Sequence, residues 1–148
     1  MPTRRAITRV NDIMSSAPKS VSTSTTIEQL LELFDRHDFN AFPVTNAVNE
    51  LVGIVTKLDL LRVLGPTEEQ DVREGTRTPE MSVGEIMRAG VISVDAEVPI
   101  NVAADAMVET GLRSIPVVLE RGGRPELVGI VSRGDVIRGF RLARRDDR

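Results

Sequence analysis

The chain has 148 residues, of which 41% are hydrophobic and 28% are charged, a composition typical of a folded globular protein. It has no Cys and one His, which excludes disulfides and thiolate metal sites, so we expect no bound metal. The net charge of −3 and the absence of Trp and Tyr argue against a nucleic-acid partner. No apolar run approaches the roughly 20 residues that span a bilayer, so we expect a cytoplasmic protein with no membrane partner.

The first half of the chain has a clear pattern of short elements. A short amphipathic turn is expected at 10–14 and a β-prone stretch at 20–22. Apolar residues at i, i+3, i+4 and i+7 from Ile27 to Phe34 predict a helix, which Thr26 and Gln29 would begin as a capping box. Two strands and a second helix complete this half: the strands are 41–44 and 51–55, joined by a turn containing Asn46 and Asn49, and the helix begins near Lys57 and carries Leu60, Leu61 and Leu64.

The second half repeats this order. Pro99 stands where a first-turn proline is tolerated, and the helix after it is expected to carry one apolar stripe formed by Ile100, Ala103, Ala104, Met107 and Val108. Strands are predicted at 114–118 and 126–131, and Val136, Ile137 and Phe140 are expected on a final helix.

Direct comparison of the two halves confirms an internal repeat. An offset of 73 residues, and of 76 after a short insertion around 121–125, aligns them. The matching segments are 10–14 with 83–87, 43–44 with 116–117, and 50–55 with 126–131. A unit of about 55 residues buries too little surface to be comfortably stable alone, so we expect the two units to share a core.

The repeat predicts the domain organisation. We expect a first unit at 8–64, a surface linker at 65–81, a second unit at 82–142 and a tail at 143–148. The fold class is α/β (α+β), with two pseudo-twofold-related β-α-β-β-α units packed sheet to sheet.

One motif recurs in register, Gly-Ile-Val-Thr-Lys-Leu-Asp at 53–59 and Gly-Ile-Val-Ser-Arg-Gly-Asp at 129–135. In each copy an apolar strand ends in a hydroxyl, followed by a cation and then an Asp at the start of a helix. Such a turn can hold a ribose-phosphate, because a helix start and a cation favour phosphate and a carboxylate accepts hydrogen bonds from ribose hydroxyls. The same residues can equally be a capping box with no ligand.

A proline lies inside an apolar strand of each copy, in Phe42-Pro43-Val44 and Ile115-Pro116-Val117. Proline has no N–H for a strand ladder, so these positions are expected at an edge or where pairing stops. Unpaired backbone there can face a ligand, although an ordinary edge strand explains the pattern equally well.

Together these motifs resemble the paired cystathionine β-synthase (CBS) domain, or Bateman module, over residues 10–140. The resemblance implies binding of adenosine-containing ligands such as AMP, ADP, ATP or S-adenosylmethionine between the two units. By resemblance Asp59 and Asp135 would hold the ribose, and the other implied ligand-binding residues are Thr56 and Ser132 for phosphate, Lys57 and Arg133 for charge, and Val21, Phe42, Pro43, Val94, Ile115 and Pro116 around the base.

The sequence has no visible nucleophile, metal cluster or cofactor loop, so we expect no enzyme activity, no catalytic residue and no catalytic cofactor. His37 is interpreted as a solvated residue at a helix end. The leading hypothesis is a regulatory module that senses an adenine nucleotide or S-adenosylmethionine, forms a homodimer and signals to a separate target protein. The alternative is a ligand-free interaction or dimerisation module.

Overall fold

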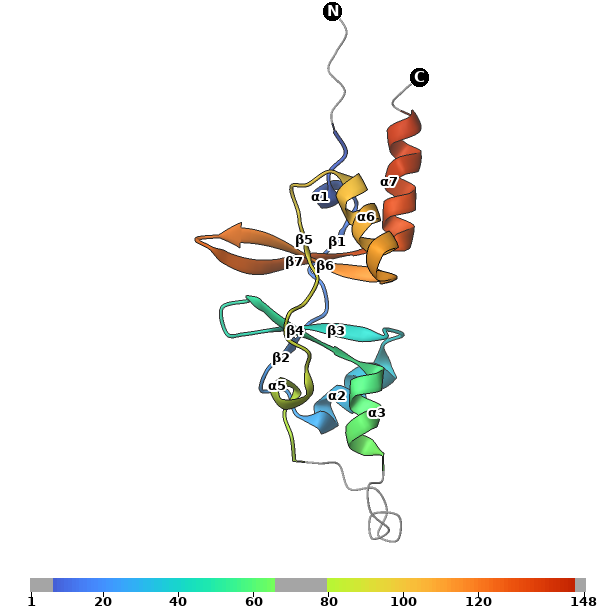
Figure 1. Cartoon of the computed structure of the whole chain (residues 1–148). Helices are drawn as coiled ribbons and strands as arrows, with labels where there is room; N and C mark the ends of the chain where they lie inside the picture. Colours follow the sequence, from blue (N-terminus) through green and yellow to red (C-terminus); the bar gives the residue numbers. More distant parts are fainter. Residues whose placement is uncertain (1–6, 66–79, 146–148) are drawn as a thin grey trace, which may run out of the picture. The chain divides into compact units, whose positions relative to one another are not determined.

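The computed structural model of the protein describes residues 7–65 and 80–145, which form two compact units. Unit 1 combines the N-terminal segment up to Pro18 with the residues from Ile92 onward, and unit 2 is the intervening segment, Lys19–Val91. Each unit has one sheet with its helices on one face (Figure 1). The mixed α/β class predicted from the sequence is therefore correct.

Unit 2 contains a three-stranded sheet of order β2-β3-β4, in which β2 is parallel to β3 and β3 is antiparallel to β4. The elements are β2 (Val21–Ser22), α2 (Ile27–Arg36), β3 (Ala41–Thr45), β4 (Leu51–Thr56), α3 (Lys57–Leu64) and α5 (Val83–Ile86).

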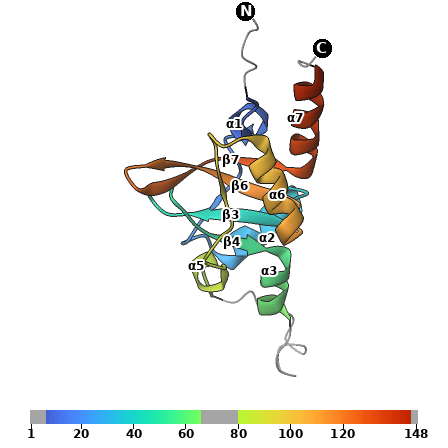
Figure 2. The same ribbon diagram turned by 45° about the horizontal axis from the view of Figure 1, so that its top comes forward.

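Unit 1 contains a four-stranded sheet of order β1-β7-β6-β5, with the same pattern of one parallel pair beside an antiparallel hairpin. The β6–β7 hairpin extends well away from α7, because the insertion around 121–125 lengthens both strands (Figure 2). The elements are α1 (Val10–Ile13), β1 (Ser15–Ser16), β5 (Val94–Asp95), α6 (Ile100–Thr110), β6 (Ser114–Arg121), β7 (Arg124–Ser132) and α7 (Arg133–Arg145).

Local sequence signals determine where the helices begin and end. The capping box predicted for α2 is confirmed, since the Thr26 backbone N–H donates to Gln29 Oε1 at 3.0 Å and the Gln29 N–H donates to Thr26 Oγ1 at 3.1 Å. Helix α6 ends at Gly111, which has a φ of 74° that favours glycine. Pro99 is the N-cap of α6, one position earlier than the first turn where it was expected.

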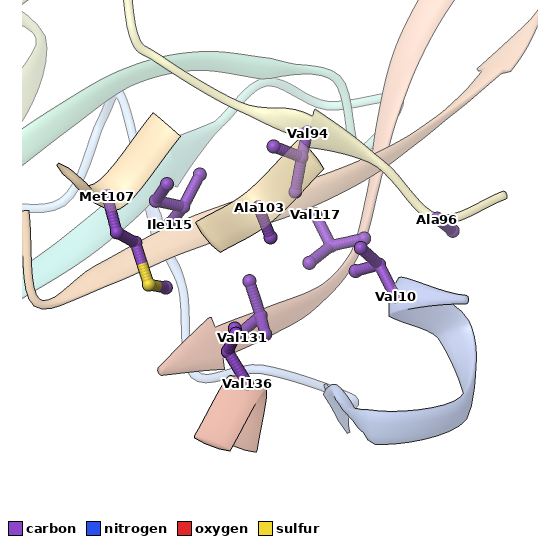
Figure 3. Close-up of a cluster of buried hydrophobic side chains, with 9 residues drawn as sticks. All are labelled: Val10, Val94, Ala96, Ala103, Met107, Ile115, Val117, Val131 and Val136. Atoms are coloured by element: carbon purple, nitrogen blue, oxygen red, sulfur yellow. The ribbon is translucent and has the colours of Figure 1, made fainter. Parts of the chain in front are cut away.

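Each unit has its own apolar core between the sheet and the helices. In unit 1 valines from the strands meet Ala103 and Met107 of α6 (Figure 3). The stripe predicted on α6 is wrong at Val108, whose side chain is 84% exposed. At 100° per residue Val108 lies about 100° from the centre of the buried face that Ile100, Ala103 and Met107 define, so it turns toward solvent.

The two sequence repeats exchange their opening segments. The short helix that opens each repeat, α1 or α5, packs in the unit built mainly from the other repeat: the N–H of Val10 donates to Val98 O at 2.9 Å, and that of Val83 donates to Thr25 O at 2.8 Å. A compact unit therefore contains residues from both sequence repeats.

Glycine makes this exchange possible. A Cβ at Gly129 would lie 2.9 Å from the carbonyl oxygen of Ser15, and one at Gly53 would lie 3.0 Å from that of Arg88. The Met-containing segments at 10–14 and 83–87 therefore approach β7 and β4 closely only because both positions lack a side chain. The linker predicted at 65–81 lies mainly outside the described residues, and α7 continues to Arg145, within the predicted tail.

Candidate functional site

The turn between β4 and α3 forms a complete capping box. The backbone N–H of Thr56 donates to Asp59 Oδ2 at 2.9 Å, and the N–H of Asp59 donates to Thr56 Oγ1 at 3.1 Å. The Thr56 hydroxyl also donates to Asp59 Oδ2, at 2.9 Å. The structural interpretation of this motif is therefore correct, and any ligand would bind to groups that already begin a helix.

Asp59 has a further partner that is distant in sequence. Arg88 Nε donates to Asp59 Oδ1 at 3.2 Å, and the Arg62 guanidinium lies 3.7 Å from the same oxygen. Two backbone hydrogen bonds hold Arg88 beside β4, from Arg88 N to Ile54 O at 2.8 Å and from Ile54 N to Arg88 O at 3.0 Å. Both carboxylate oxygens of Asp59 are thus occupied, and its side chain is only 5% exposed.

The electrostatics of Asp59 follow from these contacts. Burial alone would raise the pKa of the Asp59 carboxyl, but the hydrogen bonds from Thr56 and Arg88 and the positive charge of Arg88 outweigh burial, so its pKa is lowered. The carboxylate is accordingly held ionised, with a counter-ion supplied by the chain itself.

The equivalent turn between β7 and α7 has the same capping box but fewer contacts. The N–H of Ser132 donates to Asp135 Oδ2 at 2.8 Å, and the N–H of Asp135 donates to Ser132 Oγ at 3.1 Å. Asp135 Oδ1 accepts a hydrogen bond from Arg138 Nη2 at 2.9 Å, one turn along the same helix. Among the described residues, none outside this turn and helix contacts the carboxylate, which is 14% exposed.

The two predicted cations differ in their surroundings. Within the described parts of the chain the Lys57 ammonium has no hydrogen-bond or ion-pair partner, so it is available to an anion. The Arg133 guanidinium instead donates to the carbonyl oxygens of Leu112, at 3.1 Å, and Gly111, at 2.7 Å. These two backbone acceptors, which directly follow α6, thereby have hydrogen-bond donors. Arg133 therefore has a structural partner that the sequence did not reveal.

The residues predicted to surround a base are mostly core residues. Val21 and Phe42 belong to the core of unit 2, and Val94 and Ile115 to that of unit 1, as Figure 3 shows for the latter pair. Phe42 and Ile115 are almost completely buried, so their side chains are used in packing. What these positions can offer a ligand is chiefly their backbone.

The prolines confirm the expectation about strand pairing. Pro43 directly precedes Val44, the first residue of β3 that pairs with β2, and Pro116 directly precedes Val117, the first residue of β6 that pairs with β5. Each proline thus stands where the parallel ladder stops, and its missing N–H leaves no donor unpaired. Both remain paired on their other side, with β4 and β7.

Sequence analysis missed Arg88, because a contact across 29 residues leaves no local pattern. A signal was nevertheless present. The offset of 73 residues aligns Arg88 with Ser15, and the structure gives the two residues equivalent places: Arg88 pairs with Ile54 of β4, and Ser15 pairs with Ile130 of β7. A long cation beside β4 therefore has a short hydroxyl side chain as its counterpart beside β7.

The described residues contain no group of three or more His, Cys, Asp or Glu side chains placed to hold a metal ion. In the same residues no helix combines the length and the apolar character needed to cross a membrane.

A family model for the CBS domain matches residues 10–66 and 83–141. The chain therefore belongs to the CBS domain family and carries a tandem pair of these domains, as the resemblance implied.

Among solved structures, CBSX2 from Arabidopsis thaliana in complex with AMP is 30% identical, with a TM-score of 0.73 and coverage of 92% of this chain and 98% of that chain. The CBS domain pair of another protein, solved with 5′-methylthioadenosine and S-adenosyl-L-methionine, is 27% identical, with a TM-score of 0.67 and coverage of 93% and 98%.

Curated relatives include a chloroplastic CBS domain-containing protein, CBSX1, of Arabidopsis thaliana, which is 30% identical over 86% of this chain and 61% of its own length. Another is the L-aspartate semialdehyde sulfurtransferase of Methanocaldococcus jannaschii, 27% identical over 94% of this chain. The chain spans only 24% of the length of that relative.

Proposed function

We propose that the chain is a non-enzymatic regulatory module that binds an adenosine-containing ligand at the turns 56–59 and 132–135. The observation that carries the proposal is the repeated arrangement of a hydroxyl and a carboxylate at a helix start, in a CBS pair whose structural relatives were solved with AMP or with S-adenosylmethionine. AMP, ADP, ATP and S-adenosylmethionine are the ligands we propose to test.

Each group in the turn has a chemical role in this proposal. The Asp carboxylate would accept hydrogen bonds from the ribose hydroxyls, since an ionised carboxylate only accepts. The Thr or Ser hydroxyl and the helix start, whose dipole favours an anion, would bind phosphate, with Lys57 adding positive charge in unit 2. The backbone beside Pro43 and Pro116, where the parallel ladders stop, would contact the base.

A thermal-shift panel of these four ligands, followed by calorimetry, tests the proposal. A ligand at 100 times its dissociation constant should add about 2.7 kcal/mol of stability. The double variant Asp59→Ala/Asp135→Ala should lose that gain, since a charge-assisted hydrogen bond is worth roughly 1.5–3 kcal/mol. Glu126 lies outside the turns on the β6–β7 hairpin, so Glu126→Ala is the matched control. A panel without any shift would contradict the proposal.

A ligand-free interaction module is the second candidate, and a specific observation favours it. Leu61 on α3 and Ile137 on α7 occupy equivalent positions of the repeat, and their side chains are 63% and 70% exposed. Exposed apolar residues at equivalent positions of the two repeats are suited to contact a second copy of the chain or a target protein. Sedimentation with and without AMP separates the candidates, because a pure interaction module would associate without responding to nucleotide.

A further inference from the structure

The two repeated turns differ in what their carboxylates can still accept. Asp59 Oδ2 already accepts two hydrogen bonds from Thr56, and its Oδ1 is held by Arg88 with Arg62 nearby. Asp135 accepts one hydrogen bond at each oxygen, from Ser132 and from Arg138. A carboxylate has about four acceptor positions, so Asp135 keeps capacity that Asp59 has largely lost.

The hydroxyl groups differ in the same direction. The Thr56 hydroxyl donates its proton to Asp59, whereas the Ser132 hydroxyl donates to no residue in the described part of the chain. Ser132 therefore retains an O–H donor for a phosphate oxygen, and Thr56 would first have to break its bond to Asp59.

The cause of the difference lies in the exchanged segments. Arg88 and Ser15 stand at equivalent places beside β4 and β7, but only the arginine is long and charged enough to reach a carboxylate. The serine side chain is exposed and makes no contact with Asp135 in the described residues. The difference in distant partners is thus built by one residue outside the repeated motif.

From these contacts we infer that Arg88 is a built-in competitor for the Asp59 turn, so that the Asp135 turn is the high-affinity adenosine-ligand site. This inference rests on the proposed function and specifies its regulation. A ligand entering the Asp59 turn must displace the Arg88 guanidinium from Asp59 Oδ1, and the affinity of that turn is reduced by the free energy of the contact. In the described residues the Asp135 turn has only Arg138 of its own helix, the counterpart of Arg62, and therefore carries no cost from an additional arginine of a distant segment.

Isothermal titration calorimetry with AMP and, separately, with S-adenosylmethionine tests the inference. In the wild type one tight site per chain is expected. Asp135→Asn should weaken the tight site about tenfold or more, and Asp59→Asn should change it less than about threefold. Arg88→Ser should strengthen the second site by about tenfold, and Ser15→Arg should weaken the tight one.

Arg121→Ser is the matched control, since it removes one arginine and one ion pair, to Glu126, away from both turns. Loss of tight binding in Asp59→Asn but not in Asp135→Asn would overturn the inference. So would weaker tight binding in Arg88→Ser, which would make Arg88 a ligand contact. Arg88→Ser and Ser15→Arg change exposed side chains, so we expect both variants to fold. They therefore still test the inference if Asp59→Asn fails to fold. A wild-type chain that binds neither probe would instead overturn the proposed function, and this inference with it.

Discussion

The turns at the starts of α3 and α7 are built from the same motif, yet their carboxylates have different surroundings. Both form a capping box from a hydroxyl and an Asp three residues later. Within the described residues, only the carboxylate of the α3 turn has a partner from a distant segment, Arg88. Both repeats therefore keep the local hydrogen bonds that begin a helix. A contact that is distant in sequence determines how much capacity the carboxylate keeps to accept hydrogen bonds from a ligand.

The largest expected loss of stability concerns the close approach of an exchanged segment to a glycine, which both units have at Gly129 and Gly53. Gly129→Ala and Gly53→Ala should each cost roughly 1–3 kcal/mol of unfolding free energy, because the new methyl group overlaps the exchanged segment. The two losses should be similar, since each new Cβ would lie 2.5 Å from a Met Sδ and 2.9 or 3.0 Å from a backbone carbonyl oxygen. Urea unfolding measures both losses.

Gly134→Ala is the control for this pair. A Cβ at Gly134 would meet its nearest atom, Ser132 Oγ, at 3.7 Å, an ordinary contact. Alanine in a helix is favoured by up to about 1 kcal/mol over glycine, so this variant should be neutral or stabilising. Equal stability of all three variants would contradict the close approach that we describe.

A somewhat smaller effect distinguishes the two carboxylates. Asp59→Asn should destabilise the chain by about 2 kcal/mol, because it removes a buried charge with a charged partner. Asp135→Asn should cost about 1 kcal/mol or less, the usual range for a helix cap. Urea unfolding at neutral pH checks the difference, and a larger loss for Asp135→Asn would reverse the comparison.

The pH dependence of stability sharpens the role of Arg88. The lowered pKa of Asp59 means that its contribution is present above the ordinary Asp value of about 3.9 and is lost as the pH falls through the lowered value. In Arg88→Ser the hydrogen bond and the positive charge of Arg88 are both absent, so the pKa of Asp59 should rise and stability should fall off at a higher pH. Urea midpoints across the acid range measure this.

Arg121→Ser serves again as the control, since its ion pair lies in the β6–β7 hairpin. Its pH profile should follow that of the wild type. An unchanged profile in Arg88→Ser would indicate that the guanidinium does not influence Asp59.

The smallest expected effect concerns the exposed apolar pair. Leu61→Ser and Ile137→Ser should each change the free energy of unfolding by no more than about 0.5 kcal/mol in a monomer, as exposed positions do. Leu60→Ala, at the buried neighbouring position, is the positive control and should cost clearly more than either. A large loss for Leu61→Ser that depends on protein concentration would favour the interaction module.

Much of the fold was predictable because it is encoded locally. The repeat, the β-α-β-β-α order of elements along each copy and the capping boxes of α2, α3 and α7 follow from sequence patterns, and the structure has them. The error at Val108 arose because an i+8 residue lies at the margin of an apolar stripe, where neighbouring packing decides its exposure.

The candidate site was less predictable than the fold. The motif located both Asp residues, but not the contacts that distinguish them, since Arg88 reaches Asp59 across 29 residues through an exchanged segment. Arg133 similarly uses its guanidinium for the carbonyl groups after α6. Such contacts depend on tertiary structure, and the alignment of Arg88 with Ser15 is the sequence feature that could have indicated a difference.

The order in which the two turns respond to ligand tests the central claim most directly. Nuclear magnetic resonance can follow the backbone amides of Thr56 and Ser132, each of which donates to the Asp of its own turn. As AMP or S-adenosylmethionine is added to the wild-type chain, the Ser132 amide should shift at lower ligand concentration than the Thr56 amide. If Thr56 responds first, or both respond together, then Arg88 does not control which turn is filled.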